Sequence, residues 1–272
     1  MSTPKRFPAT LKPTAAAVQR EVLMPQRHLQ QATRDAARLA RPNGKTTGTG
    51  LDSGAVRQRM VDRLRAEGKF DERVLAAMAA VPRHEFVDSA LAAQAYEDTA
   101  LPIGHGQTIS KPSVVAHMLG LLMVSPGARQ RGSLGRVLEI GTGCGYQAAV
   151  IAMLARQVTS IERLQGLHDK AKLNLQRLVL PRAPRLVWGD GRIGHSASGP
   201  FDSIIAAAGG EDIPTAWTEQ LAPGGRLIAP TAAGGRGQVL VVLDHVVEGG
   251  VSRWLRSEHE AVLFVPLKSG VV

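Results

Sequence analysis

The chain has 272 residues, 44% of them hydrophobic, which suits one large α/β domain with a tail. No apolar stretch approaches the roughly 18 residues of a membrane span, so we expect no membrane association. The single cysteine, Cys144, cannot form an internal disulfide, and no Cys/His cluster has zinc spacing. We therefore expect no metal site and a reducing, cytoplasmic compartment.

The net charge of +10 is unevenly distributed. Residues 1–50 hold nine of the 33 Lys and Arg and two of the 23 Asp and Glu, a net charge of +7, which leaves +3 for the rest. Their Ala, Gln, Thr and Pro content is typical of a disordered basic extension with a transient helix over 14–39. No secretory signal pattern is present, whereas a transit peptide stays open as an alternative. A nucleic-acid partner is not expected, because the remaining residues carry little excess positive charge.

In chain order, apolar residues on one face predict helices from about 51 to 64 and over 71–80. Residues 83–112 are rich in loop-forming residues, and a helix follows over 112–124. Strands are then predicted at 136–140, 157–161, 185–188, 201–207 and 225–229, and helices at 146–155, 166–179 and 213–221. This alternation predicts an α/β fold with a doubly wound, mostly parallel sheet.

The last part of the chain changes pattern. Pro223-Gly224-Gly225 predicts a turn into the strand at 225–229. Strands at 238–246 and 251–265, joined across 248–250, predict an antiparallel C-terminal edge. We therefore expect one domain over 51–272, with a helical subregion at 51–125 and the sheet at 126–272.

Residues 137–145, Val-Leu-Glu-Ile-Gly-Thr-Gly-Cys-Gly, run from a predicted strand through a glycine loop into a helix. Glycines allow positive φ and a close approach of backbone to ligand. The G-x-G-x-G spacing is neither the dinucleotide fingerprint nor a phosphate P-loop. The loop residues expected at a ligand are Gly141, Thr142, Gly143, Cys144 and Gly145. Tight strand-to-helix geometry without a ligand is the alternative.

Carboxylates follow the predicted strands. Glu162 stands at the carboxyl end of the strand at 157–161 and can accept hydrogen bonds from both hydroxyls of a ribose. Glu139 precedes the glycine loop and suits a ligand that carries an ammonium group, and Asp190, before Gly191, can accept an adenine amino group. Trp188 is a candidate apolar wall beside it. A nucleoside with positive charge is therefore predicted, which favours S-adenosylmethionine over NAD.

Further segments resemble one family. Residues 100–112, Ala-Leu-Pro-Ile-Gly-His-Gly-Gln-Thr-Ile-Ser-Lys-Pro, closely resemble the segment before the cofactor motif of protein-L-isoaspartate O-methyltransferases. Val81 to Val87, Gly224 to Leu227 and Leu263 to Leu267 resemble the same family, so the similarity covers about residues 51–268. The glycine motif is shared by many methyltransferases, whereas Gly-Gln-Thr-Ile-Ser is highly specific.

The resemblance implies methyl transfer from S-adenosylmethionine to the free carboxylate of L-isoaspartyl residues in damaged peptides and proteins. It implies that Ser110 is the active-site residue, which donates a hydrogen bond to the substrate carboxyl group. It also implies that the cofactor is held by Gln107, Thr108 and Ile109, by Gly141 to Gly145, by Glu162 and by Asp190 with Gly191. Taken alone, Ser110 before Lys111-Pro112 would be a helix N-cap. We expect a monomer.

Two other functions stay open, an RNA methyltransferase and a non-catalytic module that recognises isoaspartyl or carboxyl-terminal groups. Cys144 stands where the family commonly has serine, and is interpreted as a small loop residue, with a reactive thiol as the alternative. The loop over 206–214 departs more from the family, and its Gly209 and Gly210 are expected to loosen the substrate side.

Overall fold

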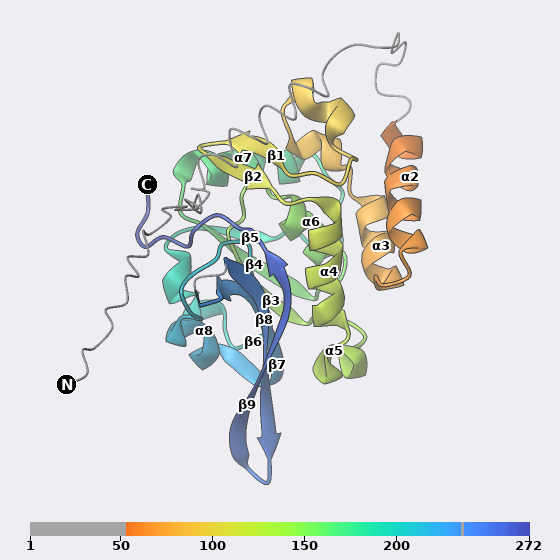
Figure 1. The fold of residues 1–272 in the computed structure, drawn as a ribbon. Coiled ribbons are helices and arrows are strands. Elements are labelled where there is room, and N and C mark those ends of the chain that lie inside the picture. Colours follow the sequence, from red (N-terminus) through yellow and green to blue (C-terminus); the bar gives the residue numbers. More distant parts are fainter. Residues whose placement is uncertain (1–52, 235–236) are drawn as a thin grey trace, which may run out of the picture.

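The computed structural model describes residues 53–234 and 237–272 (Figure 1). The predicted extension over 1–50, with its transient helix, lies outside these residues. Among the described helices, none is both long and apolar enough to cross a lipid bilayer.

A seven-stranded sheet forms the centre of the fold. Its strands are β3 (Arg136–Ile140), β4 (Gln157–Glu162), β5 (Arg185–Trp188), β6 (Phe201–Ala206), β7 (Leu221–Ala232), β8 (Gln238–Glu248) and β9 (Val251–Val262). They lie in the order β5-β4-β3-β6-β7-β8-β9, and the five from β5 to β7 run parallel. The chain enters this sheet at β3, adds β4 and β5 on one side, and then crosses to β6 on the other side of β3. The predicted doubly wound sheet is therefore confirmed.

Helices cover both faces of this sheet. They are α2 (Ser53–Ala66), α3 (Glu72–Ala80), α4 (Pro112–Met123), α5 (Pro126–Arg131), α6 (Tyr146–Ala152), α7 (Gln165–Gln176) and α8 (Thr215–Glu219). One apolar core joins the sheet face of Val137 to α4 and α6, and a second joins the face of Leu138 to Trp217 of α8. Figure 1 shows α8 on one side of the sheet and α4 with α6 on the other.

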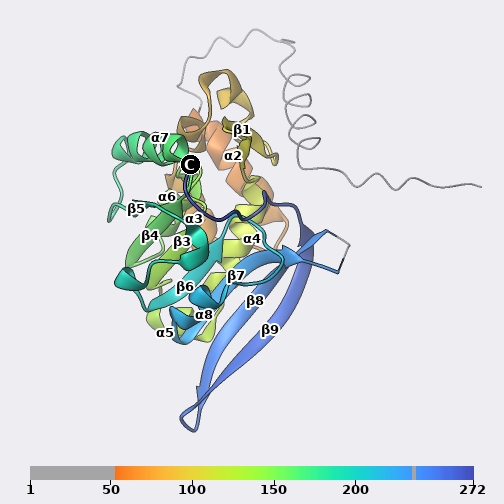
Figure 2. The same cartoon turned by 90° about the vertical axis from the view of Figure 1, so that its left-hand side faces the viewer.

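The antiparallel edge is also confirmed. β8 pairs with β7 and β9 pairs with β8, and Gly249 and Gly250 take positive φ in the turn between them. Figure 2 shows this hairpin reaching well beyond the other strands. The predicted turn at Pro223-Gly224-Gly225 is wrong as a strand boundary, because β7 already begins at Leu221 and continues through it. The pairing of β6 with β7 shifts register there, and Gly224 takes a φ of 74°.

The segment predicted as loop between 83 and 112 is more regular than expected. It contains the 3-10 helices η1 (Arg83–Phe86) and η2 (Ser89–Gln94) and an antiparallel hairpin of β1 (Leu101–Gly104) with β2 (Gln107–Ile109). The turn is made by Gly104, His105 and Gly106, all with positive φ. The glycines that suggested a loop therefore form the tight turn of a hairpin.

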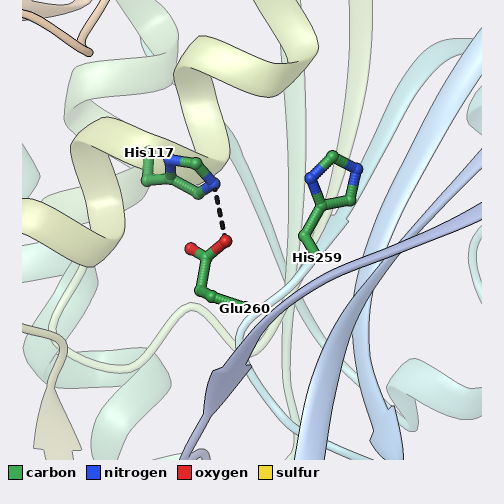
Figure 3. Close-up of side chains that lie close together, drawn as sticks. All are labelled: His117, His259 and Glu260. Carbon is green, nitrogen blue, oxygen red and sulfur yellow. Dashed lines mark ion pairs between the residues drawn. The ribbon is translucent and has the colours of Figure 1, made fainter.

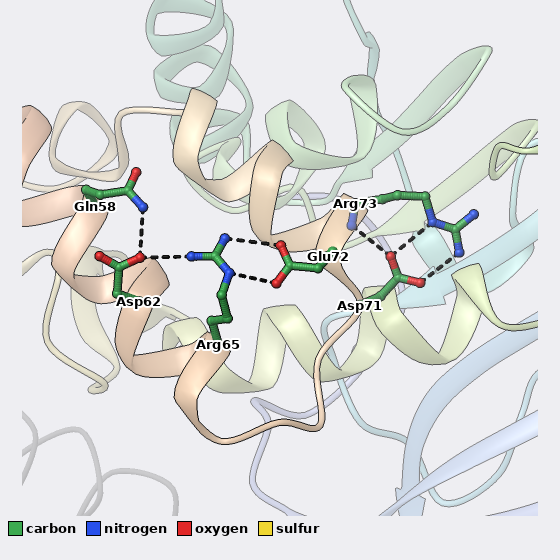
Figure 4. Close-up of polar contacts among 6 residues, drawn as sticks. All are labelled: Gln58, Asp62, Arg65, Asp71, Glu72 and Arg73. Carbon is green, nitrogen blue, oxygen red and sulfur yellow. Dashed lines mark hydrogen bonds and ion pairs between the residues drawn. The ribbon is translucent and has the colours of Figure 1, made fainter.

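Ion pairs join the first two described helices (Figure 4). Arg65 at the end of α2 lies 2.8 Å from Asp62 and 2.7 Å from Glu72 at the start of α3. Asp71 caps α3 by accepting from the backbone N–H of Arg73, whose side chain also binds it. Because most of these side chains are exposed, the pairs contribute little stability individually.

A buried arginine holds the segment that precedes α4. Arg83 of η1 has no exposed surface, and its guanidinium donates to the carbonyls of Ala95 and Ser110, both at 2.7 Å. The same guanidinium lies 4.8 Å from the ring centre of Tyr146 at the start of α6. Burial lowers the pKa of Arg83 from its ordinary value. One side chain therefore connects η1, the residue before α4, and the helix that follows the glycine loop.

A buried carboxyl group lies within the sheet. Glu139 of β3 is fully buried, and its Oε2 accepts from the hydroxyl of Ser160 on β4 at 2.5 Å. Burial raises the pKa of Glu139 to about 8, with the Ser160 hydrogen bond opposing the shift. The side-chain amide of Gln147 on α6 also lowers the pKa of Glu139. The contact is poorly aligned, since neither Gln147 Nε2 nor Glu139 Oε1 has a hydrogen bond of good geometry. Glu139 is therefore mainly protonated in the folded chain at neutral pH.

This carboxyl group makes stability depend on pH. Between about pH 4.5 and pH 8 the folded state keeps the proton and the unfolded state releases it, so the free energy of unfolding falls as pH rises. The contribution has a slope of at most about 1.4 kcal/mol per pH unit and levels off above pH 8. Urea unfolding of the wild-type chain and Glu139→Gln from pH 5 to pH 9 measures it. We expect the variant to lose most of this slope, and parallel profiles would contradict the assignment.

Candidate active site

A cavity of about 510 Å³ lies at the carboxyl ends of the parallel strands. Its walls include residues that follow β3, β4 and β6, together with Gly191 after β5. The β1–β2 hairpin and residues 265–268 supply further walls. Open parallel sheets bind ligands at this edge, next to the strand where the chain reverses its direction of progress, which here is β3.

The glycine loop forms one wall. Gly141, Gly143 and Gly145 have φ values of 89°, 57° and 92°, a region that side chains rarely adopt. A Cβ atom at Gly143 would lie 3.2 Å from Cδ1 of Ile103 on the hairpin. The loop backbone is therefore bare where it faces the cavity, as predicted for contact with a ligand.

Glu162 fixes this loop from the neighbouring strand. Its carboxylate accepts from the backbone N–H of Gly143 at 2.9 Å and from that of Leu164 at 3.0 Å. The side chain is largely buried and lines the cavity. Each carboxylate oxygen has a second lone pair, so Glu162 can hold the loop and still accept from two hydroxyl groups of a ligand.

Ser110 lies on the hairpin side of the cavity, with Gln107, Thr108 and Ile109 of β2 before it. Within the described residues its hydroxyl makes no hydrogen bond, while its carbonyl is held by Arg83. The helix N-cap is Lys111, without a side-chain cap, so the prediction that Ser110 is also the N-cap is wrong. The structure thus holds the backbone of Ser110 firmly and leaves its hydroxyl free.

The structure brings together most of the predicted site residues and leaves three outside the lining. The lining contains Gln107, Thr108, Ile109, Ser110, Gly141, Thr142, Gly143, Cys144, Glu162 and Gly191. Gly145 instead packs against α7, where a Cβ atom would lie 3.3 Å from Ala171 Cβ. Glu139 points away, because side chains alternate along β3 and Ile140 takes the cavity side.

Asp190 is the third residue outside the lining. Its Oδ1 accepts from the backbone N–H of Arg192, and its Oδ2 accepts from that of Gly270 at 2.6 Å. Trp188 does not line the cavity either, is 46% exposed, and donates to the carbonyl of Arg163. Contact of Asp190 or Trp188 with an adenine ring stays a prediction that this geometry does not support.

Cys144 is almost fully buried, and burial raises the pKa of its thiol. A raised pKa keeps the thiol neutral and poorly nucleophilic. The backbone carbonyl of Cys144 accepts from Asn174 of α7 at 3.0 Å. This environment favours the interpretation of Cys144 as a small loop residue over the reactive thiol.

Sequence reasoning missed several residues of this site. Gln147 and Tyr146, in the first turn of α6, line the cavity, and each has a buried polar atom without a hydrogen-bond partner, Nε2 and the hydroxyl oxygen. Lys170 of α7 donates to the carbonyl of Ile103 at 2.9 Å and so ties the hairpin down. Their position directly after a glycine loop was a signal for the first two, whereas nothing local in the sequence marks Lys170 or Arg83.

The loop over 206–214 is held rather than loosened. Gly209 donates to the carbonyl of Val265 and its own carbonyl accepts from Leu267, both at 2.8 Å. A Cβ atom at Gly209 would lie 2.3 Å from the side-chain amide of Gln238, which would have to move to admit it. The expectation of a looser substrate side is wrong, because this glycine permits a close approach between segments.

The comparisons with known proteins agree with this geometry. A sequence profile of the protein-L-isoaspartate(D-aspartate) O-methyltransferase family matches residues 55–272. Protein-L-isoaspartate O-methyltransferase of Methylibium petroleiphilum is 58% identical over 269 residues, which cover 97% of this chain and 96% of the relative. Its counterpart in Leptothrix cholodnii is 56% identical over 277 residues, covering 97% and 94%.

Solved structures show the same fold. A putative protein-L-isoaspartate O-methyltransferase of Plasmodium falciparum, in complex with S-adenosyl-L-homocysteine, superposes with a TM-score of 0.63 at 24% identity and covers 78% of this chain and 98% of its own. A second solved protein-L-isoaspartate O-methyltransferase gives a TM-score of 0.62 at 28% identity, covering 78% and 66%. With its glycine loop, Glu162 and Ser110 around one cavity, this chain belongs to the protein-L-isoaspartate(D-aspartate) O-methyltransferase family.

Proposed function

We propose that this cavity binds S-adenosylmethionine along the glycine loop and that Ser110 holds the free carboxylate of an L-isoaspartyl residue for methylation. The observation that carries the proposal is the free Ser110 hydroxyl at the wall of the cavity that Glu162 and the glycine loop also line. The chain thereby performs the reaction for which its family is named.

The residues of the cavity fit this cofactor. The bare backbone at Gly141 and Gly143 permits close contact, and Glu162 has lone pairs left for ribose hydroxyls. The side chain of Gln147, in the first turn of α6 after the glycine loop, also lines the cavity. When bound, the sulfonium cofactor supplies an electrophilic methyl group.

The catalytic work left to the chain is positioning. A carboxylate is already ionised at neutral pH, so no general base is needed to form the nucleophile. The Ser110 hydroxyl donates a hydrogen bond to one carboxylate oxygen and leaves the other to attack. Because Arg83 holds the carbonyl of Ser110, the backbone that carries this hydroxyl has little freedom to move. A reaction that neutralises charge also benefits from exclusion of water, and the buried Ile103 and Ile109 of the hairpin provide apolar cover there.

We further propose that the chain works as a monomer in the cytoplasm. The buried neutral thiol of Cys144 suits a reducing compartment. Light scattering of the purified chain during size-exclusion chromatography, with and without residues 1–50, tests the first statement, and a dimer mass in both forms would refute it.

Replacement of Ser110 tests the catalytic assignment. We expect Ser110→Ala to lower kcat/KM on an isoaspartyl peptide by about 10- to 100-fold, the cost of a hydrogen bond to a charged group. Binding of S-adenosylhomocysteine should change little, because the hydroxyl faces the substrate. Ser89→Ala, at an exposed serine of η2, is the matched control. Full activity of the Ser110 variant would remove this hydroxyl from the mechanism.

Replacement of Glu162 tests the cofactor site. We expect Glu162→Gln to weaken S-adenosylhomocysteine binding by about 10- to 100-fold, because hydrogen bonds to the charged carboxylate are lost. Isothermal titration calorimetry measures the affinity, with Glu219→Gln on the exposed surface of α8 as control. Equal affinity of the Glu162 variant and the wild type would contradict the proposed ribose contact.

A substrate comparison tests the function as a whole. Labelled methyl transfer is measured on an isoaspartyl peptide, the matching aspartyl peptide and RNA. We expect transfer to the isoaspartyl peptide alone. Transfer to RNA only would establish the nucleic-acid alternative, and cofactor binding without any transfer would establish the non-catalytic module.

A further inference from the structure

Two histidines and a glutamate from distant parts of the chain meet outside the cavity walls. His117 lies on α4, and His259 and Glu260 are neighbours on β9. One candidate ligand atom from each side chain lies within 4.8 Å of the others. Figure 3 shows the three side chains converging between the helix and the strand. Sequence spacing predicted no metal site because these residues share no local motif.

The imidazole of His117 faces the carboxylate of Glu260. Its Nε2 lies 3.0 Å from Oε2 of Glu260, close enough for an ion pair. Nevertheless this buried nitrogen has no hydrogen bond of good geometry within the described residues. A nitrogen and a carboxylate oxygen that lie side by side without a well-aligned proton between them can both direct lone pairs at a shared cation.

His259 adds a second nitrogen. Figure 3 shows one of its ring nitrogens turned toward Glu260 and the other turned away. Nε2 lies 3.2 Å from the hydroxyl of Ser257, which leaves Nδ1 for a ligand bond. A hydrogen bond at the second ring nitrogen is the arrangement that orients metal-binding histidines in general.

Little competes for the carboxylate. Among the described residues, the one salt bridge recorded for Glu260 is the pair with His117. Lys69 is near enough for Glu260 to raise its pKa slightly, but the strongest influence on Lys69 is Glu67, 2.7 Å from its ammonium group. The Glu260 carboxylate is thus available to a cation.

We propose that His117, His259 and Glu260 bind a divalent transition-metal ion, with Zn²⁺ as the best match. Two imidazole nitrogens and one carboxylate oxygen form a ligand set that zinc accepts in tetrahedral sites, with water in the fourth position. Ligand atoms on one tetrahedral zinc ion are about 3.3 Å apart, so small side-chain rotations from the present separations suffice. Mg²⁺ and Ca²⁺ prefer oxygen ligands and fit poorly.

Such an ion would connect two segments that border the cavity. α4 begins at Pro112, two residues after Ser110, and β9 leads into the segment 265–268 that lines the cavity. The ion would therefore tie the edge strand to the helix after the catalytic serine and stabilise the folded chain by binding it selectively. This inference concerns metal binding and does not rest on the proposed function.

Zinc titration of the full chain tests the proposal. Metal-free protein is titrated with Zn²⁺ in competition with a chromophoric chelator, and thermal unfolding is followed with and without Zn²⁺. We expect a zinc site that raises the unfolding midpoint of the wild type. His259→Ala and Glu260→Gln should each weaken it by at least roughly tenfold, since even changes around metal ligands cost that much.

The controls separate this site from other histidines. His168→Ala removes a histidine that pairs with Asp169 elsewhere on the surface, and it should bind zinc as the wild type does. His259 and Glu260 lie on an edge strand, and circular dichroism of both metal-free variants confirms that they fold. Unchanged zinc affinity in both variants would overturn the proposal, as would equally tight binding of Mg²⁺.

Discussion

The site depends on one constraint, which is that the glycine loop between β3 and α6 passes very close to neighbouring segments. The loop must turn from a buried strand into a helix with Ile103 on one side and α7 on the other, and side chains at 143 or 145 would meet them at 3.2–3.3 Å. Glycine meets this requirement and leaves backbone N–H groups available. One of them donates to Glu162, so the residue that we propose as the acceptor for a ribose also holds the loop in place.

Arg83 connects the proposed cofactor side of the cavity to the proposed substrate side. α6 starts at the glycine loop on the cofactor side, and its first residue, Tyr146, lies against the Arg83 guanidinium. Arg83 in turn holds the carbonyl of Ser110 on the substrate side. Desolvation of Arg83 is costly and lowers its pKa, and two carbonyls and an aromatic face offset part of this cost. The position of Ser110 relative to the start of α6 is therefore fixed by a buried cation as well as by the hairpin.

The sequence predicts those parts whose signals are local. The strand at 136–140, the glycine loop and Glu162 follow from hydrophobic runs and from the rule that ligands sit at strand ends. Glu139 and Asp190 were assigned by the same rule, yet neither lines the cavity. Glu139 takes the opposite face of β3, and Asp190 is engaged by the backbone of Gly270, a contact between segments that no local pattern contains. The hairpin at 101–109 was missed because its glycines suggested an irregular loop.

Glu139 does not line the cavity, but hydrogen bonds connect it to a residue that does. In the folded chain its protonated carboxyl group, Ser160 and Thr142 form a row of hydrogen bonds beneath the loop, with Thr142 Oγ1 2.6 Å from Ser160 Oγ. A neutral acid can take part in such a row as donor or acceptor, whereas a carboxylate could only accept. The row reaches Thr142, which lines the cavity. Glu139 therefore bears on the site by supporting Thr142 through Ser160, without lining the cavity itself.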